Sequence, residues 1–345
     1  MPSSENKSPK DIVVVGASAG GVEALRVMLS YLSPSIGASI FIVLHLPSNS
    51  RSMLATILGN ELPFEVVVPT DGMPIEPSKI YVAPPGVHLT LTTTHIRLSH
   101  GPKVNGVRPA IDPLFRSAAY VFGSRVIAVV LTGTLDDGTA GIVSVKRKGG
   151  VTVAQDPIEA TFSEMPERAI ESGAVDHILP LDEIAELINA SGAMKTSEEP
   201  TNPNQPERSP SHREPQSPDW DRKIAEDILA QEEGEPEGHS TVLTCPECGG
   251  VMWETDESGL IRFQCHVGHA YTVDNFHEAQ EARVEAALWS AVRLLTEKAA
   301  LNRKLISRLE ASGSSHRSLE RFEQQALDAE RDAAVLRQIL LKGTV

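Results

Sequence analysis

Short apolar runs alternate with longer amphipathic stretches along the first half of the chain. Runs rich in Val and Ile predict β-strands, and apolar positions three and four residues apart predict helices. Apolar strands that alternate with helices are typical of β-α-β units around a mostly parallel sheet. We therefore predict an α/β fold of the doubly wound, Rossmann-like kind, with the sheet between two layers of helices. The clearest strands are expected at residues 12–15, 40–44, 65–68 and 126–131, weaker ones at 80–83, 151–154 and 177–179, and a hairpin at 89–98. Helices are expected at residues 22–32, 51–58, 112–122, 138–148, 166–172 and 181–188.

The composition changes after residue 190. Residues 191–238 are rich in Ser, Pro, Glu and Asn and poor in large apolar side chains, which predicts a disordered linker with a short helix at 219–231. The predicted domains are an α/β domain at 1–190, this linker, a small cysteine-containing module at 239–276 and two helical arms at 277–345.

Composition also indicates which partners the chain can bind and which cell compartment it is expected in. The net charge of −15 argues against a surface for nucleic acid or anionic membranes, since both need a basic patch. No apolar run is long enough to span a bilayer, and the polar start of the chain lacks the apolar core of a signal peptide. Three cysteines, clustered late in the chain, favour metal ligation in a reducing compartment over disulfides. We expect a cytoplasmic protein with no membrane insertion.

Residues suited to nucleophilic catalysis follow three of the predicted strands. A G-x-S-x-G turn that contains Ser18 follows the first strand and leads into a helix, which exposes the serine beside unpaired backbone N–H groups. His45 follows the second strand, and Asp136 and Asp137 come after the strand at 126–131. The carboxyl ends of parallel strands meet at one edge of a sheet. We therefore expect a serine nucleophile, a histidine base and a carboxylate that orients the histidine.

Other functions fit parts of this pattern. A glycine-rich turn between a strand and a helix also cradles phosphates, but this turn lacks the lysine of a P-loop. Each candidate residue alone also fits a structural role, as a tight turn, a strand-end hydrogen bond or a helix cap. We favour catalysis because all three candidates are expected at the same sheet edge. A sensory scaffold, in which the fold only binds partners, stays open as the alternative.

Further motifs lie in order along residues 11–187. They are Gly16-Ala17-Ser18-Ala19-Gly20-Gly21, His45-Leu46-Pro47, Tyr81-Val82-Ala83-Pro84-Pro85-Gly86-Val87-His88, Asn105 with Arg108-Pro109 and Asp112, Thr132-Gly133 with Asp137-Gly138, and Ala154-Gln155 with Met165-Pro166. With these motifs the segment resembles the catalytic domain of the CheB-type protein-glutamate methylesterases of bacterial chemotaxis.

The resemblance implies a serine hydrolase that needs no cofactor for catalysis. Its substrates would be γ-methyl esters of glutamates on the cytoplasmic domains of methyl-accepting receptors, and methanol would be released. Some members of the family also deamidate receptor glutamine. By position, the resemblance makes Ser18 the nucleophile, His45 the base and Asp137 the acid, and leaves Asp136 as the neighbour of the acid.

The resemblance also implies oxyanion or substrate-binding roles for Ala19, Thr134 and Arg108. Thr134 departs from the family pattern, which has Gly-Met-Gly where this chain has Gly-Thr-Leu. A backbone N–H donor survives a change of side chain, but the loop geometry and the rate can change. Family members usually carry an N-terminal receiver domain. The residues before the first strand are too few for one, so we expect no control by a fused receiver.

Cys245, Cys248, Cys265 and His269 have the spacing of a zinc ribbon. The first two form a C-x-x-C turn, and the last two supply a second pair of ligands. His269 is preferred to His266 because three intervening residues allow its side chain to turn back to the metal. We predict structural zinc, with free cysteines as the alternative. Because the module has little apolar core, metal loss is expected to unfold it and to leave esterase activity nearly intact. The strands expected between the two pairs are 252–254 and 260–263.

Apolar residues recur in steps of three and four along residues 277–345. Such a stripe predicts a helical hairpin or coiled coil, and self-association or a protein partner at the same surface is the alternative. The stripe residues are Leu319, Phe322, Ala326, Ala329, Ala333, Leu336 and Leu340 in the last arm, and Leu288, Val292, Leu295, Ala299, Ile306 and Leu309 in the preceding arm, where polar Asn302 interrupts.

Overall fold

A computed structural model describes residues 11–45, 53–192, 238–256, 259–311 and 316–342. The chain divides into two compact units, Met1–Asn275 and Phe276–Val345. The linker predicted at 191–238 lies outside the described residues except at its two ends, and the helix predicted at 219–231 lies wholly outside them.

The centre of the first unit is a seven-stranded sheet with the order β3-β4-β2-β1-β7-β8-β9. Every neighbouring pair of strands in it is parallel. All seven strands match strands predicted from the sequence, which confirms the α/β class. Their bounds are β1 Ile12–Ala17, β2 Ser39–Leu44, β3 Glu65–Val67, β4 Lys79–Val82, β7 Val126–Val130, β8 Val151–Gln155 and β9 His177–Leu179.

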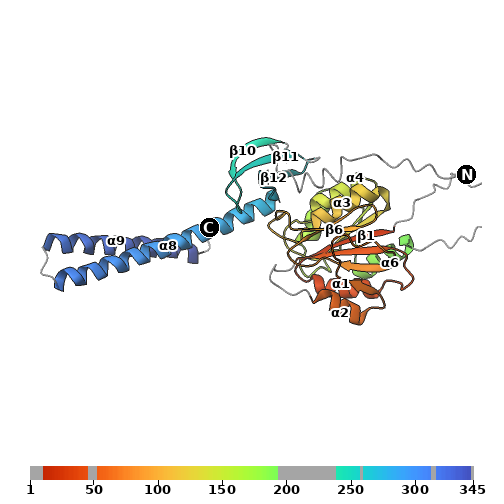
Figure 1. The fold of residues 1–345 in the computed structure, drawn as a ribbon, viewed down its shortest axis with the longest axis horizontal. Coiled ribbons are helices and arrows are strands. Elements are labelled where there is room, and N and C mark those ends of the chain that lie inside the picture. Colours follow the sequence, from red (N-terminus) through yellow and green to blue (C-terminus); the bar gives the residue numbers. More distant parts are fainter. Residues whose placement is uncertain (1–10, 46–52, 193–237, 257–258, 312–315, 343–345) are drawn as a thin grey trace, which may run out of the picture. The chain divides into compact units, whose positions relative to one another are not determined.

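Helices cover both faces of this sheet (Figure 1). Alternate residues of β1 point to opposite faces, with Val13 and Val15 in one apolar core and Ile12 and Val14 in the other. Because both faces are buried, the strands are apolar throughout instead of alternating with polar residues. One core contains side chains of α1 Gly21–Ser30, α2 Leu54–Glu61 and α6 Leu181–Gly192, and the other contains side chains of α3 Ile111–Phe122, α4 Thr139–Arg147 and α5 Glu164–Glu171.

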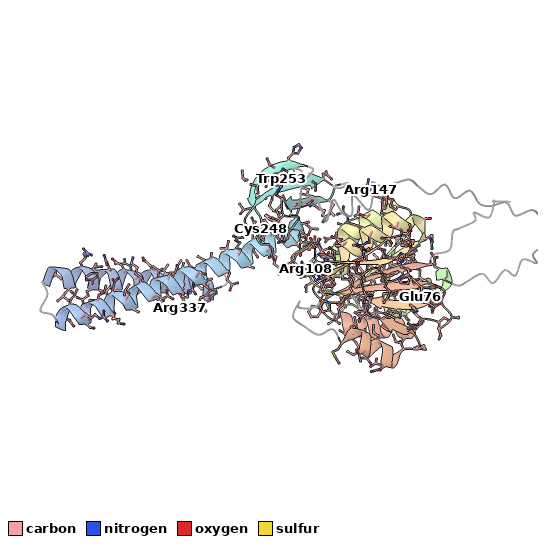
Figure 2. All side chains as sticks on the ribbon, in the orientation of Figure 1. Glu76, Arg108, Arg147, Cys248, Trp253 and Arg337 are labelled. Atoms are coloured by element: carbon pink, nitrogen blue, oxygen red, sulfur yellow. The ribbon has the colours of Figure 1, made fainter. Side chains whose placement is uncertain are left out.

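Two small antiparallel sheets complete the first unit. Strands β5 His88–Leu91 and β6 Ile96–Ser99 form the predicted hairpin. The cysteine-containing module is a four-stranded ribbon with the order β10-β11-β12-β13, two strands more than the sequence predicted. Trp253 and Cys248, labelled in Figure 2, belong to this ribbon. The ribbon strands are β10 His239–Thr244, β11 Val251–Asp256, β12 Ile261–Cys265 and β13 Ala270–Thr272.

Two long helices, α8 Val273–Ala311 and α9 His316–Leu341, account for the described part of the second unit, which starts within α8. They lie side by side (Figure 1), and Arg303 of α8 makes two 2.9 Å hydrogen bonds to Glu330 of α9. The most deeply buried stripe residues are Val292, Ala299, Ala326, Ala329 and Ala333. None of the helices in the described ranges has the length and apolar character required to cross a bilayer.

Candidate active site

Ser18 lies in a tight turn between β1 and α1. Its backbone N–H donates to the carbonyl of Thr132 at 3.0 Å. Gly20 has a φ of 75°, a left-handed conformation that glycine adopts without a steric cost. The chain therefore reverses within the G-x-S-x-G segment, and Ser18 stands half-buried at the carboxyl end of the central strand.

The segment after β7 packs directly against this turn. A Cβ atom on Gly133 would lie 2.8 Å from the Cβ of Ser18 and 2.3 Å from the Sδ of Met165, so only glycine fits there. The hydroxyl of Thr132 donates to the carbonyl of Ala19 at 3.0 Å. The turn that contains Ser18 is thus packed against the segment after β7, which holds its backbone in place.

His45 is the first residue after β2 and lies next to Ser18. Its Nδ1 is 3.2 Å from the Ser18 Oγ, and its Nε2 is 2.7 Å from the Asp137 Oδ2. When the imidazole proton is on Nε2 and donated to Asp137, the lone pair of Nδ1 faces the serine. In the general serine-protease arrangement the two ring nitrogens have the opposite roles. The geometry is that of a base oriented by a buried acid.

Asp137 is buried and fully engaged by hydrogen bonds. Its Oδ2 accepts from the backbone N–H of Ile111 at 2.6 Å, and its Oδ1 accepts from the Asn105 amide at 2.8 Å. Ile111 is the first residue of α3, so the carboxylate also sits at a helix N-terminus, which favours negative charge. Burial opposes ionisation, yet the hydrogen bonds from His45, Ile111 and Asn105 outweigh it and hold the pKa of Asp137 below its usual range.

A second buried carboxyl, Asp112, lies behind the first. It accepts hydrogen bonds from the backbone N–H groups of Gly138 and Gly141, at 3.1 and 2.7 Å. The amide of Asn105 bridges the two acids, because it also lies 3.2 Å from the Asp112 Oδ2. Burial, and then the charge of Asp137, raise the pKa of Asp112 to about 7. The sequence motifs included Asn105 and Asp112 but gave them no role.

Asp136 faces away from His45. Its Oδ1 accepts a 2.7 Å hydrogen bond from the hydroxyl of Thr272, in ribbon strand β13, and another from the amide of Asn275. Burial raises the pKa of Asp136 to about 7. Of the two adjacent aspartates, therefore, Asp137 is the one that contacts the candidate base.

The three residues expected at the oxyanion or substrate site have different surroundings. Thr134 is exposed and follows Gly133, so it lies beside the nucleophile turn that contains Ala19. The Nη1 of Arg108 instead donates to the carbonyls of His100 and Gly101, at 2.8 and 2.5 Å. These contacts hold a loop in place, and a substrate-binding role for Arg108 stays a prediction.

The predicted metal ligands come together in the ribbon. The ligand atoms of Cys245, Cys248, Cys265 and His269 all lie within 4.8 Å of one another. The Sγ atoms of Cys248 and Cys265 are 3.7 Å apart, close to the roughly 3.8 Å expected for two thiolates on one tetrahedral zinc. His266, the alternative ligand, is exposed. The four residues therefore fit a metal in number, type and spacing.

Residues 13–188 match the CheB methylesterase family. A protein-glutamate methylesterase/protein-glutamine glutaminase of Pyrococcus horikoshii is 38% identical over 180 residues, which are 51% of this chain and 49% of that protein. One from Anaeromyxobacter dehalogenans is 40% identical over 174 residues, 50% of this chain and 51% of that protein. The chain thus spans about half the length of these relatives. A putative enzyme of the same name from Leptospira interrogans is 37% identical over 178 residues, 51% of this chain and 92% of that protein.

A solved structure shows the same fold. The crystal structure of the CheB methylesterase catalytic domain of Thermotoga maritima matches with a TM-score of 0.51 and 34% identity, over 53% of this chain and 99% of that one. The family match ends at residue 188, before the ribbon and the helical arms.

Proposed function

Because the chain belongs to the CheB methylesterase family, we propose that it hydrolyses the methyl esters of glutamate side chains on the cytoplasmic domains of chemotaxis-type receptors. Methanol and the free glutamate are the products. The observation that carries the proposal is the hydrogen-bonded chain from Ser18 through His45 to the buried Asp137. The names of the relatives also support deamidation of receptor glutamine, in which ammonia leaves in place of methanol.

The geometry supports a two-step acyl transfer. Ser18 Oγ attacks the ester carbonyl carbon while its proton moves to His45 Nδ1, and the Asp137 carboxylate stabilises the imidazolium that forms. His45 then gives the proton to the departing methoxide oxygen, which leaves as methanol. A water molecule attacks the acyl-enzyme with His45 as base again, and the glutamate is released with Ser18 restored.

The oxyanion of each tetrahedral intermediate needs backbone donors. We place this role on the N–H groups of Ala19 and Thr134. Ala19 follows the nucleophile and directly precedes Gly20, the N-cap of α1, and Thr134 follows the glycine that packs against Ser18. A threonine in this position keeps the backbone donor that the family pattern requires.

A fluorophosphonate probe separates this enzyme from a scaffold that only binds receptors. Such a probe phosphonylates a serine activated by a base but leaves ordinary surface serines unmodified. We expect one adduct per chain, on Ser18, identified by peptide mass spectrometry. Ser30, an exposed serine whose hydroxyl donates to the Val27 carbonyl, is the internal control and should stay unmodified. An unmodified Ser18 under conditions that label a known serine hydrolase would favour the scaffold.

We further propose that the cysteine and histidine cluster holds a structural zinc ion. Three thiolates and one imidazole suit zinc, and all four coordination positions are filled by the protein. Elemental analysis should find about one zinc per chain, as expected for one four-ligand site. Zinc content should fall in Cys248→Ser and in His269→Ala, whereas His266→Ala, which changes the neighbouring exposed histidine, should retain it. A purified metal-free protein with an ordered ribbon would contradict the zinc assignment.

A further inference from the structure

Strand β13 of the ribbon contacts the loop that supports the catalytic acid. The backbone N–H of Asn105 donates to the Ala270 carbonyl at 2.7 Å, and the side-chain oxygen of Asn105 accepts from the Thr272 N–H at 3.1 Å. Asn105 is buried and has a φ of 52°, unusual for a residue other than glycine. The ribbon therefore holds both ends of this residue, its backbone and its side chain.

A second contact reaches the residue next to the catalytic acid. The Thr272 hydroxyl and the Asn275 amide both donate to Asp136, and each of these three side chains is buried. Arg168 of α5 also pairs with Asp274, at 3.2 Å. The ribbon thus contacts the surroundings of the acid at two points. One is Asn105, which donates to Asp137 from a separate loop, and the other is Asp136, which directly precedes Asp137 in the chain.

The same strand is continuous with the metal cluster. Cys265 ends β12 and His269 directly precedes β13, and the N–H of Cys265 donates to the carbonyl of His269 at 2.9 Å. A metal bound by Cys265 and His269 would close the turn that leads into Ala270. Loss of the metal would release the strand from Asn105.

We propose that ribbon strand β13 positions the catalytic acid, with Asn105 as the positioning residue, so that metal occupancy of the ribbon sets the rate of the esterase. This inference rests on the function proposed above. The amide of Asn105 bonds Asp137 on one side, while β13 holds Asn105 on the other. We therefore expect metal loss to lower esterase activity, contrary to the expectation from the sequence that metal loss leaves this activity nearly intact.

The first test, in the full chain, compares two histidines of the same turn, His266 and His269. His269→Ala removes a metal ligand, and His266→Ala removes an exposed imidazole from the same turn. We expect His269→Ala to slow fluorophosphonate labelling of Ser18 at least about 10-fold, because small displacements of a catalytic group have large effects on rate. His266→Ala should label at the rate of the wild type. Equal labelling rates in the two variants would overturn the proposal.

A second pair of variants leaves the metal ligands intact. Thr272→Val removes the hydroxyl that donates to Asp136, whereas Thr272→Ser keeps it. Labelling of Ser18 should be about fivefold slower in Thr272→Val, because one buried hydrogen bond near the acid is lost. In Thr272→Ser, which keeps the hydroxyl, Ser18 should be labelled at the wild-type rate. On an ester substrate the loss should appear in kcat with KM unchanged, because Thr272 acts on the position of the acid through its hydrogen bonds to Asn105 and Asp136. Normal kcat in Thr272→Val would count against the coupling.

Amide hydrogen exchange tests the contact between the ribbon and Asn105 without depending on esterase activity. The Asn105 amide, bonded to Ala270, should be protected in the zinc-loaded wild type and lose its protection in His269→Ala. This result would support coupling between the metal site and Asn105 even if Ser18 of the wild type is not labelled and no methanol is released. Absence of labelling and of methanol release would contradict only the esterase function. Unchanged protection in metal-free His269→Ala would remove the coupling, whatever the activity.

Discussion

Ser18→Ala is expected to abolish methanol release from methylated receptor, with a loss of at least about 10³-fold in kcat. The change removes the oxygen that lies 3.2 Å from the candidate base, and no other nucleophile is placed there by the arrangement described above. The assay is release of radioactive methanol from receptor methylated with a labelled methyl donor.

The matching control is Ser30→Ala, which removes an exposed hydroxyl of α1 and should leave the rate unchanged. The free energy of unfolding of Ser18→Ala, measured in urea, should stay within about 1 kcal/mol of the wild type, because the half-buried hydroxyl adds little to the core. Full activity in Ser18→Ala would show that the nucleophile lies elsewhere.

Asp137→Asn is expected to lower kcat by about 10³- to 10⁴-fold. Its carboxylate accepts from the imidazole at 2.7 Å and from the first N–H of α3 at 2.6 Å. Both of these donors share Oδ2, and Asn105 donates to Oδ1, so an amide nitrogen in place of either oxygen would face a donor where an acceptor is needed. A neutral amide also cannot stabilise an imidazolium as a carboxylate does. Kinetics on methylated receptor, with KM and kcat measured separately, would show the loss in kcat.

The adjacent residue provides the control for this prediction. Asp136→Asn keeps an oxygen acceptor for Thr272 and Asn275, and burial already favours the uncharged form by raising the pKa of Asp136 to about 7. We therefore expect Asp136→Asn to keep activity within a few-fold of the wild type. A severe loss in Asp136→Asn together with normal activity in Asp137→Asn would reverse the two assignments.

The sheet and the three strand-end candidates could be predicted from the sequence because their signals are local. Each parallel strand is buried on both faces, which leaves a continuous apolar run such as Val13 to Val15. Ser18 and His45 directly follow such runs, and β1 lies between β2 and β7 in the sheet. Because these strands are neighbours, their carboxyl ends place the candidate side chains close together, and no long-range information is needed to predict this.

The hydrogen bonds from Asn105 to Asp137 and from the ribbon to Asn105 could not be predicted in the same way. Asn105 sits in a loop with no hydrophobic periodicity, and its partner Thr272 is 167 residues away along the chain. The contact of Asp136 with the ribbon spans a similar separation. Local patterns predicted the ribbon and the cluster of its three cysteines with His269 but carried no signal for where β13 packs. For this reason the sequence suggested independent modules, whereas the structure shows shared hydrogen bonds.

Methanol release from the methylated cytoplasmic domain of a chemotaxis-type receptor tests the proposed esterase function most directly. Wild-type protein is incubated with receptor that carries labelled methyl esters, and Ser18→Ala serves as the blank. We predict time-dependent release of labelled methanol by the wild type, with recovery of free glutamate at the methylated positions and background release by the variant. Release that is equal in the two proteins, or absent from both across a panel of methylated receptors, would contradict this prediction.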